Sequence, residues 1–404
     1  MKRTETLVCI ILVIVMICME ACSGQTSASN TTASQNNGAV TTQTTAVVVQ
    51  SSETAGQSSD TPATGTESGR KVLVGISIRS LSAEYESNLY EGAKKYIPLS
   101  FPETEFEFVP MEANGDMQQQ IEDIRAFAAR EGDKILYIDP QGTAACQPIA
   151  EICEDNKIYW TSQCTMIEGS APWDYHYYVS HILMNDEVSA YDTATALFDS
   201  FNGEEANVVA CLGDLWGNTA IYRTIGLERA LAEYPNVTLL DKQPIEWNTE
   251  KAMSLTQTWL SQYGAEHLDG IWVCMDAGAL AVVEALRKEG LNGKIKVTGI
   301  DGVSGAIEAM KSGDMVATEC IYPINMGCVG VTIAYLALTG QIDPDEISQN
   351  RDQSAFFAPS LLVEQGNLEW YIANYIDTYP DFDASTVFEW GTGCYDEENL
   401  YSKS

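Results

Sequence analysis

The sequence has few basic residues and very few histidines. Of its 404 residues, 22 are lysine or arginine and 57 are aspartate or glutamate, so the formal net charge is −35 at pH 7. A body this acidic repels phosphate backbones and anionic membranes, which argues against nucleic-acid binding and requires any membrane contact to be local. The three histidines, His176, His181 and His267, lack zinc-ligand spacing. We therefore expect neither a metal nor a cofactor.

Nucleotide-binding and catalytic motifs are also missing. The sequence contains no G-x-S-x-G elbow, no P-loop, no H-E-x-x-H and no G-x-G-x-x-G after a predicted strand. Pairs of acidic residues suit a glycosidase in principle, but no spacing marks two of them as partners. An enzyme is unsupported, and a secreted carbohydrate enzyme is only a distant alternative.

The eleven cysteines form no C-x-x-C pair. Exported proteins with this many cysteines usually contain disulfides. Cys9 and Cys18, however, lie in the apolar segment near the N-terminus, and several of the others lie inside apolar runs. We expect the eight cysteines after Cys22 to be reduced, buried and to act as small hydrophobic residues: Cys146, Cys153, Cys164, Cys211, Cys274, Cys320, Cys328 and Cys394.

The N-terminus resembles an export signal. Lys2 and Arg3 precede the apolar run Leu7–Met19, whose thirteen residues are too few for a membrane span of about 20. The run leads into Ala21-Cys22, which resembles the lipobox of bacterial lipoproteins, where the cysteine receives the lipid. We expect residues 1–22 to be a lipoprotein signal peptide with lipidated Cys22. Met19 and Glu20 depart from the usual pattern, so simple secretion with cleavage nearby is the alternative.

A segment of low complexity follows the signal. In residues 23–70, 20 of 48 residues are serine or threonine and only four are charged. Such a composition buries too little apolar area to offset its ordering entropy, so it predicts a disordered tether. A glycosylated stalk is an alternative use of the same composition.

Apolar, β-branched runs alternate with helical patterns along residues 71–340. The expected strands of the first half are 72–78, 106–110, 135–139 and 158–161, and its expected helices are 83–96, 117–129 and 143–154. The alternation restarts with a helix at 188–201 and continues to a helix at 326–338. Apolar strands separated by single helices predict parallel sheets covered on both faces. The predicted fold class is α/β, with two doubly wound parallel-sheet lobes.

Polar or aromatic residues follow many of the expected strands. Ligands of open parallel sheets bind beyond the carboxyl ends of strands, so these residues are candidates for a site: Tyr85, Asp139, Gln163, Trp216, Trp247, Asp276, Asp301 and Tyr322. Asp139, Asp276 and Asp301 are equally suited to turns or helix N-caps. Their repetition at successive strand ends favours a ligand site.

An ordered set of motifs gives the chain a family resemblance. It consists of Arg223–Leu227 (RTIGL), Asp276–Leu280 (DAGAL), Val297–Gly302 (VTGIDG) and Ala317-Thr318. Over roughly residues 72–340 the chain resembles the sugar-binding type I periplasmic binding proteins, the receptors of ABC importers. The resemblance implies two lobes joined by a multi-strand hinge. The first lobe would comprise residues 71–183 plus about 322–345, and the second 184–321 plus about 355–404.

The resemblance also implies a set of ligand-binding residues. It places Tyr85, Glu86, Asp139 and Gln163 on the first lobe, and Arg223, Trp247, Asp276 and Asp301 on the second. Flat aromatic rings suit the C–H faces of a sugar, and planar Asp and Arg groups suit adjacent hydroxyls. Arg223 pairing with Asp301 or Asp276 in an empty site is the structural alternative. Arg79 and Met275 depart from the family pattern, so the identity of the sugar is not predicted.

The implied function is that of an extracellular, lipid-anchored receptor. It would capture a sugar by hinge closure and deliver it to an ABC-type permease, touching the membrane only through its lipid. The alternative is a sensory receptor that presents a sugar or furanose-type signal to a membrane signalling partner. A cytoplasmic repressor of related fold is disfavoured, because residues 1–70 hold a signal and a tether instead of a DNA-binding helix pair.

Overall fold

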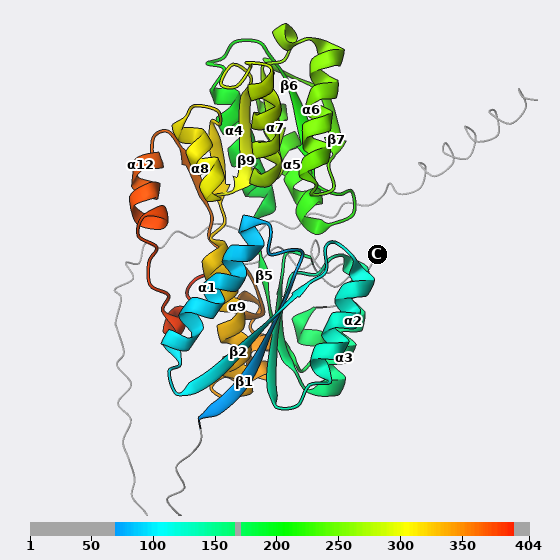
Figure 1. The fold of residues 1–404 in the computed structure, drawn as a ribbon, viewed down its shortest axis with the longest axis vertical. Coiled ribbons are helices and arrows are strands. Elements are labelled where there is room, and N and C mark those ends of the chain that lie inside the picture. Colours follow the sequence, from blue (N-terminus) through cyan, green and yellow to red (C-terminus); the bar gives the residue numbers. More distant parts are fainter. Residues whose placement is uncertain (1–68, 166–170, 392–404) are drawn as a thin grey trace, which may run out of the picture. The chain divides into compact units, whose positions relative to one another are not determined.

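The computed structural model describes residues 69–165 and 171–391, which form two lobes, each built on a six-stranded sheet (Figure 1). The first sheet has the strand order β11-β5-β4-β3-β1-β2, and all its pairs are parallel. Its strands are β1 (Arg70–Ile78), β2 (Thr104–Glu112), β3 (Asp133–Ile138), β4 (Tyr159–Gln163), β5 (Tyr178–Leu183) and β11 (Ala355–Phe357).

The second sheet repeats this arrangement with one change of direction. Its order is β12-β10-β9-β8-β6-β7, parallel throughout except that β12 runs antiparallel to β10. Its strands are β6 (Ala206–Leu212), β7 (Val237–Pro244), β8 (Gly270–Val273), β9 (Lys296–Asp301), β10 (Ala317–Cys320) and β12 (Leu361–Glu364).

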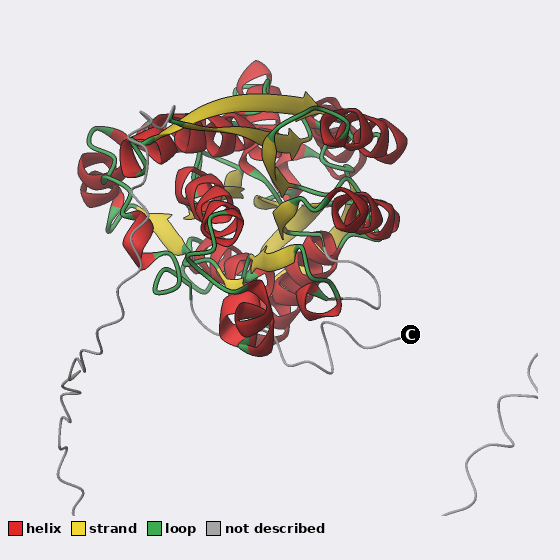
Figure 2. Ribbon diagram, turned by 90° about the horizontal axis from the view of Figure 1, so that it is seen from below, coloured by secondary structure: helices red, strands yellow, loops and turns green. Residues whose placement is uncertain are grey.

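Helices surround both sheets (Figure 2). In the first lobe, α1 (Glu84–Ser100) packs on α9 (Pro323–Leu338), and α2 (Met117–Ala128) packs on α3 (Thr143–Asn156). In the second lobe, α4 packs on α5 and α6 packs on α7. The remaining bounds are α4 (Asp186–Asp199), α5 (Asn218–Glu233), α6 (Thr249–Tyr263), α7 (Asp276–Lys288), α8 (Ser304–Lys311), α10 (Pro344–Gln349), α11 (Arg351–Ser354) and α12 (Leu368–Tyr371). Within the described ranges, no helix combines the length and the apolar character of a membrane span.

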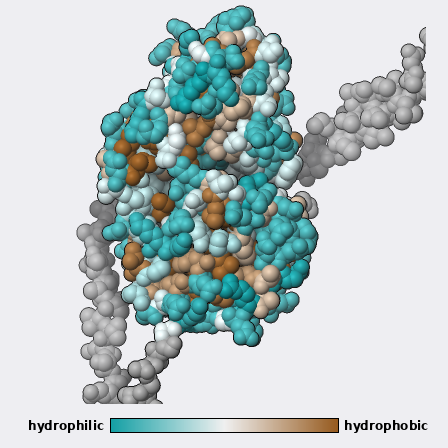
Figure 3. All heavy atoms as spheres, viewed as in Figure 1, coloured by the Kyte–Doolittle hydropathy of each residue, from teal (hydrophilic) through white to brown (hydrophobic). Residues whose placement is uncertain are grey.

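The strands are apolar throughout because both faces of each sheet are covered. Every residue of β1 from Val72 to Ile78 is buried, and all four residues of β8 are buried. The apolar side chains of these strands are thus inside the lobes, whereas the surface seen in Figure 3 is mainly hydrophilic, with hydrophobic residues gathered in several patches. Continuous apolar runs are typical of such doubly covered parallel strands. The predicted class of two doubly wound α/β lobes is confirmed.

Strand β5 was not predicted, because Ser180 and His181 interrupt its apolar pattern. His181 is fully buried, and its Nδ1 lies 2.6 Å from the Ser162 hydroxyl on the neighbouring strand. Burial lowers the pKa of His181 to about 3, so the ring is neutral at physiological pH. Polar residues buried inside the sheet, such as Ser180 and His181, give no periodic apolar signal in the sequence.

The chain passes between the lobes three times before it reaches β12. It leaves the first lobe between β5 and α4, returns between β10 and α9, and leaves again between β11 and β12. Residues 355–363 were expected to form one final strand of the second lobe, but Pro359 divides the run because it has no N–H for a ladder. As a result, β11 joins the first sheet beside β5, and only β12 joins the second.

The segment after β12 also departs from its predicted place in the second lobe. Tyr371 does lie there, and its hydroxyl is 2.9 Å from the Cys320 sulfur. Further on, the Tyr379 hydroxyl bonds to Asn325 of α9, and Ala384–Thr386 packs on the same helix, so this part belongs to the first lobe. The predicted signal peptide, almost all of the tether (residues 23–68) and Cys394 lie outside the described residues.

The seven described cysteines after Cys22 are all unpaired thiols. Six of them are buried, and Cys164 is partly buried. Burial raises the pKa of Cys274 and of Cys320 to about 12, so both remain protonated and unreactive. For these seven residues, the prediction of reduced cysteines is confirmed.

Gly226, part of the RTIGL motif, sets the distance between α4 and α5. A Cβ at Gly226 would lie 2.1 Å from the Glu187 carbonyl oxygen and 2.9 Å from the Ala190 Cβ. Alanine is intrinsically better than glycine in a helix by about 1 kcal/mol. Overpacking of this kind costs about 1–3 kcal/mol, so the clash outweighs the gain in helix propensity.

We therefore expect Gly226→Ala to lower the free energy of unfolding by about 1–3 kcal/mol, as measured by urea denaturation. Gly305→Ala is the matched control, because its Cβ would meet only the tip of the Leu280 side chain. That variant should change the free energy by less than about 1 kcal/mol. A gain in stability from Gly226→Ala would contradict the close approach of the two helices.

Candidate functional site

A cavity of about 510 Å³ lies between the two lobes. Its walls come from the segments that follow β1, β3 and β4 in the first sheet and β6 to β9 in the second. This is the edge at which ligands of open parallel sheets bind. The cavity is therefore the candidate site.

Six of the eight predicted site residues line this cavity. They are Tyr85, Glu86 and Asp139 from the first lobe, and Arg223, Trp247 and Asp301 from the second. Gln163 and Asp276 are fully buried and are not among the lining residues. The structure thus brings together the two sets of predicted residues, one from each lobe, which are far apart in the sequence. It places Gln163 and Asp276 behind the cavity wall.

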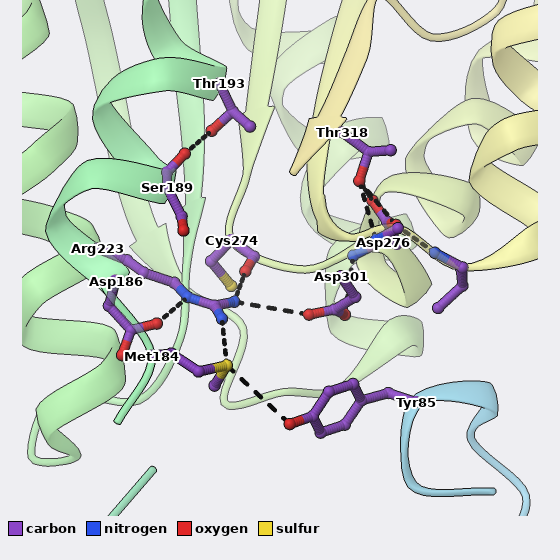
Figure 4. A network of polar contacts seen from close by, with 12 residues as sticks. Tyr85, Met184, Asp186, Ser189, Thr193, Arg223, Cys274, Asp276, Asp301 and Thr318 are labelled. Atoms are coloured by element: carbon purple, nitrogen blue, oxygen red, sulfur yellow. Dashed lines mark hydrogen bonds and ion pairs between the residues drawn. The ribbon is translucent and has the colours of Figure 1, made fainter. Parts of the chain in front are cut away.

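Arg223 is held from behind by a carboxylate that was not predicted (Figure 4). Its Nε lies 2.8 Å from Asp186 Oδ1, its Nη1 also donates to the Cys274 carbonyl, and only 2% of its side chain is exposed. Asp301 is a more distant partner, at 3.9 Å. Burial alone would lower the pKa of Arg223, but Asp186 and Asp301 hold it above its ordinary value. The guanidinium therefore stays charged inside the lobe.

Asp276 supports the site from behind the cavity wall, and its role as a ligand-binding residue stays a prediction. Its Oδ2 accepts the backbone N–H groups of Gly302 at 2.8 Å and Val303 at 3.0 Å, and the Thr318 hydroxyl lies 2.8 Å from both oxygens. These bonds fix the turn after β9, where Asp301 and Gly302 both have positive φ. The turn presents Asp301 to the cavity, while the bonds of Asp276 are made to Gly302, Val303 and Thr318 within the lobe.

Gln163 likewise lies behind the cavity wall, and its role as a ligand contact stays a prediction. Its Oε1 is 2.5 Å from the Tyr137 hydroxyl and 3.4 Å from the Tyr85 hydroxyl. The Tyr85 hydroxyl also approaches the sulfur of Met184 at 4.0 Å (Figure 4). Tyr85 therefore lines the cavity while its hydroxyl is directed toward the strands and the hinge.

Three carboxyl groups of the cavity, those of Glu86, Asp139 and Asp301, have raised pKa values. Burial, reinforced by Asp139, raises the pKa of Glu86 to about 7, and burial raises that of Asp139 to about 6. Arg79 opposes both shifts. The pKa of Asp301 is also raised, by burial and by the nearby carboxyls, although Arg223 opposes the shift. These groups are short of positive partners.

Trp247 is positioned by a loop of the second lobe. Its Nε1 donates to Asp214 Oδ2 at 2.7 Å, and Asp214 Oδ1 accepts the backbone N–H of Gly217 at 2.5 Å. The Arg223 guanidinium lies 5.7 Å from the centre of the Trp247 ring. Both tryptophan ring and arginine are therefore fixed before any ligand arrives.

Several lining residues were not predicted as ligand contacts. Arg79 follows β1 directly and Asp214 lies two residues after β6, so their place after a strand was an available signal. Trp216 was named among the residues after strands but not among the ligand contacts that the resemblance implies, and it is 60% exposed at the cavity. Met184 lies in a crossing between lobes and had no such signal. Tyr322 also follows a strand, but it packs on Tyr375 and is not among the lining residues.

One pair of residues joins the lobes across the cavity edge. Glu84, in the first turn of α1, accepts the Ser304 backbone N–H at 2.8 Å and the Ser304 hydroxyl at 3.0 Å. Ser304 is the first residue of α8, and a carboxylate is stabilised at a helix N-terminus. This contact holds the two lobes together at that edge.

Comparison with known proteins places the chain in a family. The family model of the periplasmic binding protein domain matches residues 74–342. The chain is 25% identical over 268 residues to the ribose import binding protein of Haemophilus influenzae, covering 66% of this chain and 86% of that protein. It is 31% identical to the xylitol-binding protein of Mycolicibacterium smegmatis over 134 residues, 33% of this chain and 38% of that protein.

Solved structures have the same fold. A twin-arginine translocation pathway signal protein from Burkholderia phytofirmans is 32% identical, with a TM-score of 0.71 over 82% of this chain and 96% of that chain. An ABC transporter periplasmic solute binding protein from Actinobacillus succinogenes, with bound D-allose, is 21% identical, with a TM-score of 0.65 over 74% of this chain and 99% of that chain. The chain therefore belongs to the periplasmic binding protein family, in the type I group that its motifs resemble.

Proposed function

We propose that this protein is an extracellular receptor that captures a sugar between its lobes and delivers it, chemically unchanged, to an ABC-type permease. The observation that carries the proposal is the cavity between the lobes, where aromatic and charged side chains from both sides face one space. The ligands in the names of its relatives, ribose, xylitol and D-allose, are all polyhydroxylated.

The lining residues match the two kinds of surface that a sugar presents. Trp247 and Tyr85 offer aromatic rings for the C–H faces. Asp301 offers carboxylate oxygens, and the Nη2 of Arg223 has only the Met184 sulfur nearby, at 3.9 Å. Thioether sulfur is a weak acceptor, so this donor remains available to a ligand hydroxyl.

Binding by both lobes couples capture to closure. Tyr85, Glu86 and Asp139 come from the first lobe, whereas Arg223, Trp247 and Asp301 come from the second. A ligand makes all of these contacts only when the lobes are together, so it shifts the hinge equilibrium toward the closed form. The closed form is then the shape that a permease recognises.

Residues 1–70 support a position outside the cell membrane. A signal peptide ending before Cys22, a lipid on that cysteine and a flexible tether would hold the lobes near a permease. The acidic body repels anionic lipid headgroups, which makes a covalent lipid the expected means of membrane contact.

Thermal-shift measurements on the full-length protein with a panel of mono- and disaccharides test the proposal. A ligand at 100 times its dissociation constant adds about 2.7 kcal/mol to the free energy of unfolding, which raises the melting temperature measurably. At least one member of the panel should do so. A panel without effect at millimolar concentrations would contradict sugar binding.

Asp301 and Arg223 should respond differently to substitution. Asp301→Asn should weaken sugar binding by about 1.5–3 kcal/mol, roughly ten- to hundredfold, because a charge-assisted bond is lost. Arg223→Met should in addition destabilise the fold by about 3–5 kcal/mol, because it leaves Asp186 buried without its cation. Calorimetric titration and urea denaturation separate the two effects. Equal stability of Arg223→Met and the parent protein would contradict the structural role of the ion pair.

Trp247→Ala should weaken sugar binding by about 1–2 kcal/mol through the loss of ring stacking. Trp370→Ala is the control, because Trp370 is 52% exposed on α12 and is not among the cavity residues. Fluorescence or calorimetric titration of both variants gives the comparison. An unchanged affinity in Trp247→Ala would mean that this ring does not contact the ligand.

A further inference from the structure

The cavity contains more carboxylates than cations. Its lining includes five acidic residues, Glu84, Glu86, Asp139, Asp214 and Asp301, but only two basic ones, Arg79 and Arg223. Two of the acidic groups are occupied by the protein itself: Glu84 by Ser304, and Asp214 by Trp247 and backbone N–H groups. Glu86, Asp139 and Asp301 are left to face a ligand.

The two cations do not balance these three carboxyls. The positive charge of Arg223 is divided between two carboxylates. Its Nε donates a hydrogen bond to Asp186 at 2.8 Å, and its Nη1 lies 3.9 Å from Asp301. Arg79 is the other lining cation, and it acts on both Glu86 and Asp139. Glu86, from the first lobe, raises the pKa of Asp301 on the second lobe. The surplus charge at the site is therefore negative.

Glu86 is the carboxylate most in need of a ligand. It is 92% buried, with a relative exposure of 8%, and it lines the cavity. Within residues 69–165 and 171–391, no other residue donates a hydrogen bond to its carboxylate. A buried carboxylate that receives a hydrogen bond from its own backbone N–H but from no other described residue is costly, so further donors must come from whatever fills the cavity.

The aromatic residues of the cavity suit the same kind of ligand. Tyr85, Trp216 and Trp247 all line it. The faces of aromatic rings attract cations as well as the C–H groups of sugars. Arg223 already lies over Trp247, whereas Trp216 is 60% exposed. Carboxylates together with open aromatic faces form a suitable environment for an ammonium group.

From this arrangement we propose that the ligand is a polyhydroxylated compound carrying an ammonium group, such as an amino sugar or an amino polyol, with its nitrogen near Glu86. The inference rests on the proposed function, because it places a charge on the sugar that the cavity is built to hold. An anionic sugar is disfavoured, because both the cavity and the body, with its net charge of −35, repel it. A neutral sugar leaves the surplus carboxylates without a counter-charge.

Matched pairs of ligands test the proposal on the full-length protein. The probes are D-glucosamine with D-glucose, D-galactosamine with D-galactose, and 1-amino-1-deoxy-D-sorbitol with D-sorbitol, each titrated calorimetrically. In at least one pair the aminated member should bind about tenfold tighter or more, the scale of one charge-assisted hydrogen bond. N-acetylation of that member, which removes the charge, should abolish the preference.

Two variants locate the effect. Glu86→Gln keeps the shape of the side chain but removes its charge, so it should reduce the preference within the pair to about threefold or less. Glu91→Gln is the matched control on the same helix, with its side chain 59% exposed and paired with Lys94. That variant should leave the preference unchanged. A preference that survives Glu86→Gln would overturn the placement of the nitrogen.

The pH dependence provides an independent measurement. Glu86 faces Asp139 and Arg79, with Asp301 across the cavity, and its pKa in the empty site is about 7. An ammonium group favours the ionised carboxylate, so affinity for the amino polyol should rise between about pH 5.5 and about pH 7.5, where an aliphatic amine stays charged. Affinity for the neutral polyol should change little or fall.

The outcomes separate the two proposals. Neutral sugars that bind as tightly as, or more tightly than, their aminated partners would overturn the ammonium inference and leave the sugar receptor intact. If no neutral or aminated probe binds and the wider saccharide panel is also without effect, the proposed function fails and the inference fails with it.

Discussion

The second lobe's half of the site depends on one buried ion pair, between Arg223 and Asp186. A guanidinium with 2% of its side chain exposed persists only where a carboxylate and further acceptors replace water. Asp186 is the first residue of α4 and Arg223 lies on α5. The Cys274 carbonyl, which accepts a hydrogen bond from Arg223 Nη1, follows β8. One side chain therefore fixes two helices and a strand end relative to one another. The close approach at Gly226, one turn further along α5, is part of the same packing.

The ion pair between Arg223 and Asp186 determines which charged groups remain available to a ligand. Because Asp186 holds the Nε of Arg223 at 2.8 Å, Asp301 at 3.9 Å receives only a partial share of the positive charge. Asp301 is in turn kept in place by Asp276, which accepts the backbone N–H groups of the following turn. The supporting residues Asp186 and Asp276 direct their hydrogen bonds to groups within the protein. Asp301, which Asp276 keeps in place, directs carboxylate oxygens at the cavity.

The same distinction explains which parts of the site were predictable. Asp276 and Asp301 both follow apolar strands, so the sequence gives them the same signal. They differ in their tertiary contacts, because Asp276 faces the turn after the neighbouring strand while Asp301 faces the other lobe. The alternation of apolar strands and helices likewise predicted both lobes. It did not predict β5, where the buried polar residues Ser180 and His181 interrupt the apolar pattern, or β11, whose place depends on pairing with a strand more than 170 residues earlier.

The surplus of carboxylates also bears on how the lobes close. Glu86 and Asp139 belong to the first lobe and Asp301 to the second, so bringing the lobes together over an empty cavity brings like charges together in a medium of low dielectric. The bridge from Glu84 to Ser304 opposes that repulsion at one edge. Closure of the empty protein then depends on two opposing interactions. The hydrogen bonds between Glu84 and Ser304 favour it, and the repulsion among the buried carboxylates opposes it. A ligand that supplies donors to these carboxylates removes the repulsive side of the balance, because it neutralises or hydrogen-bonds the same groups that hold the lobes apart. The closed form thereby reports that the cavity is occupied.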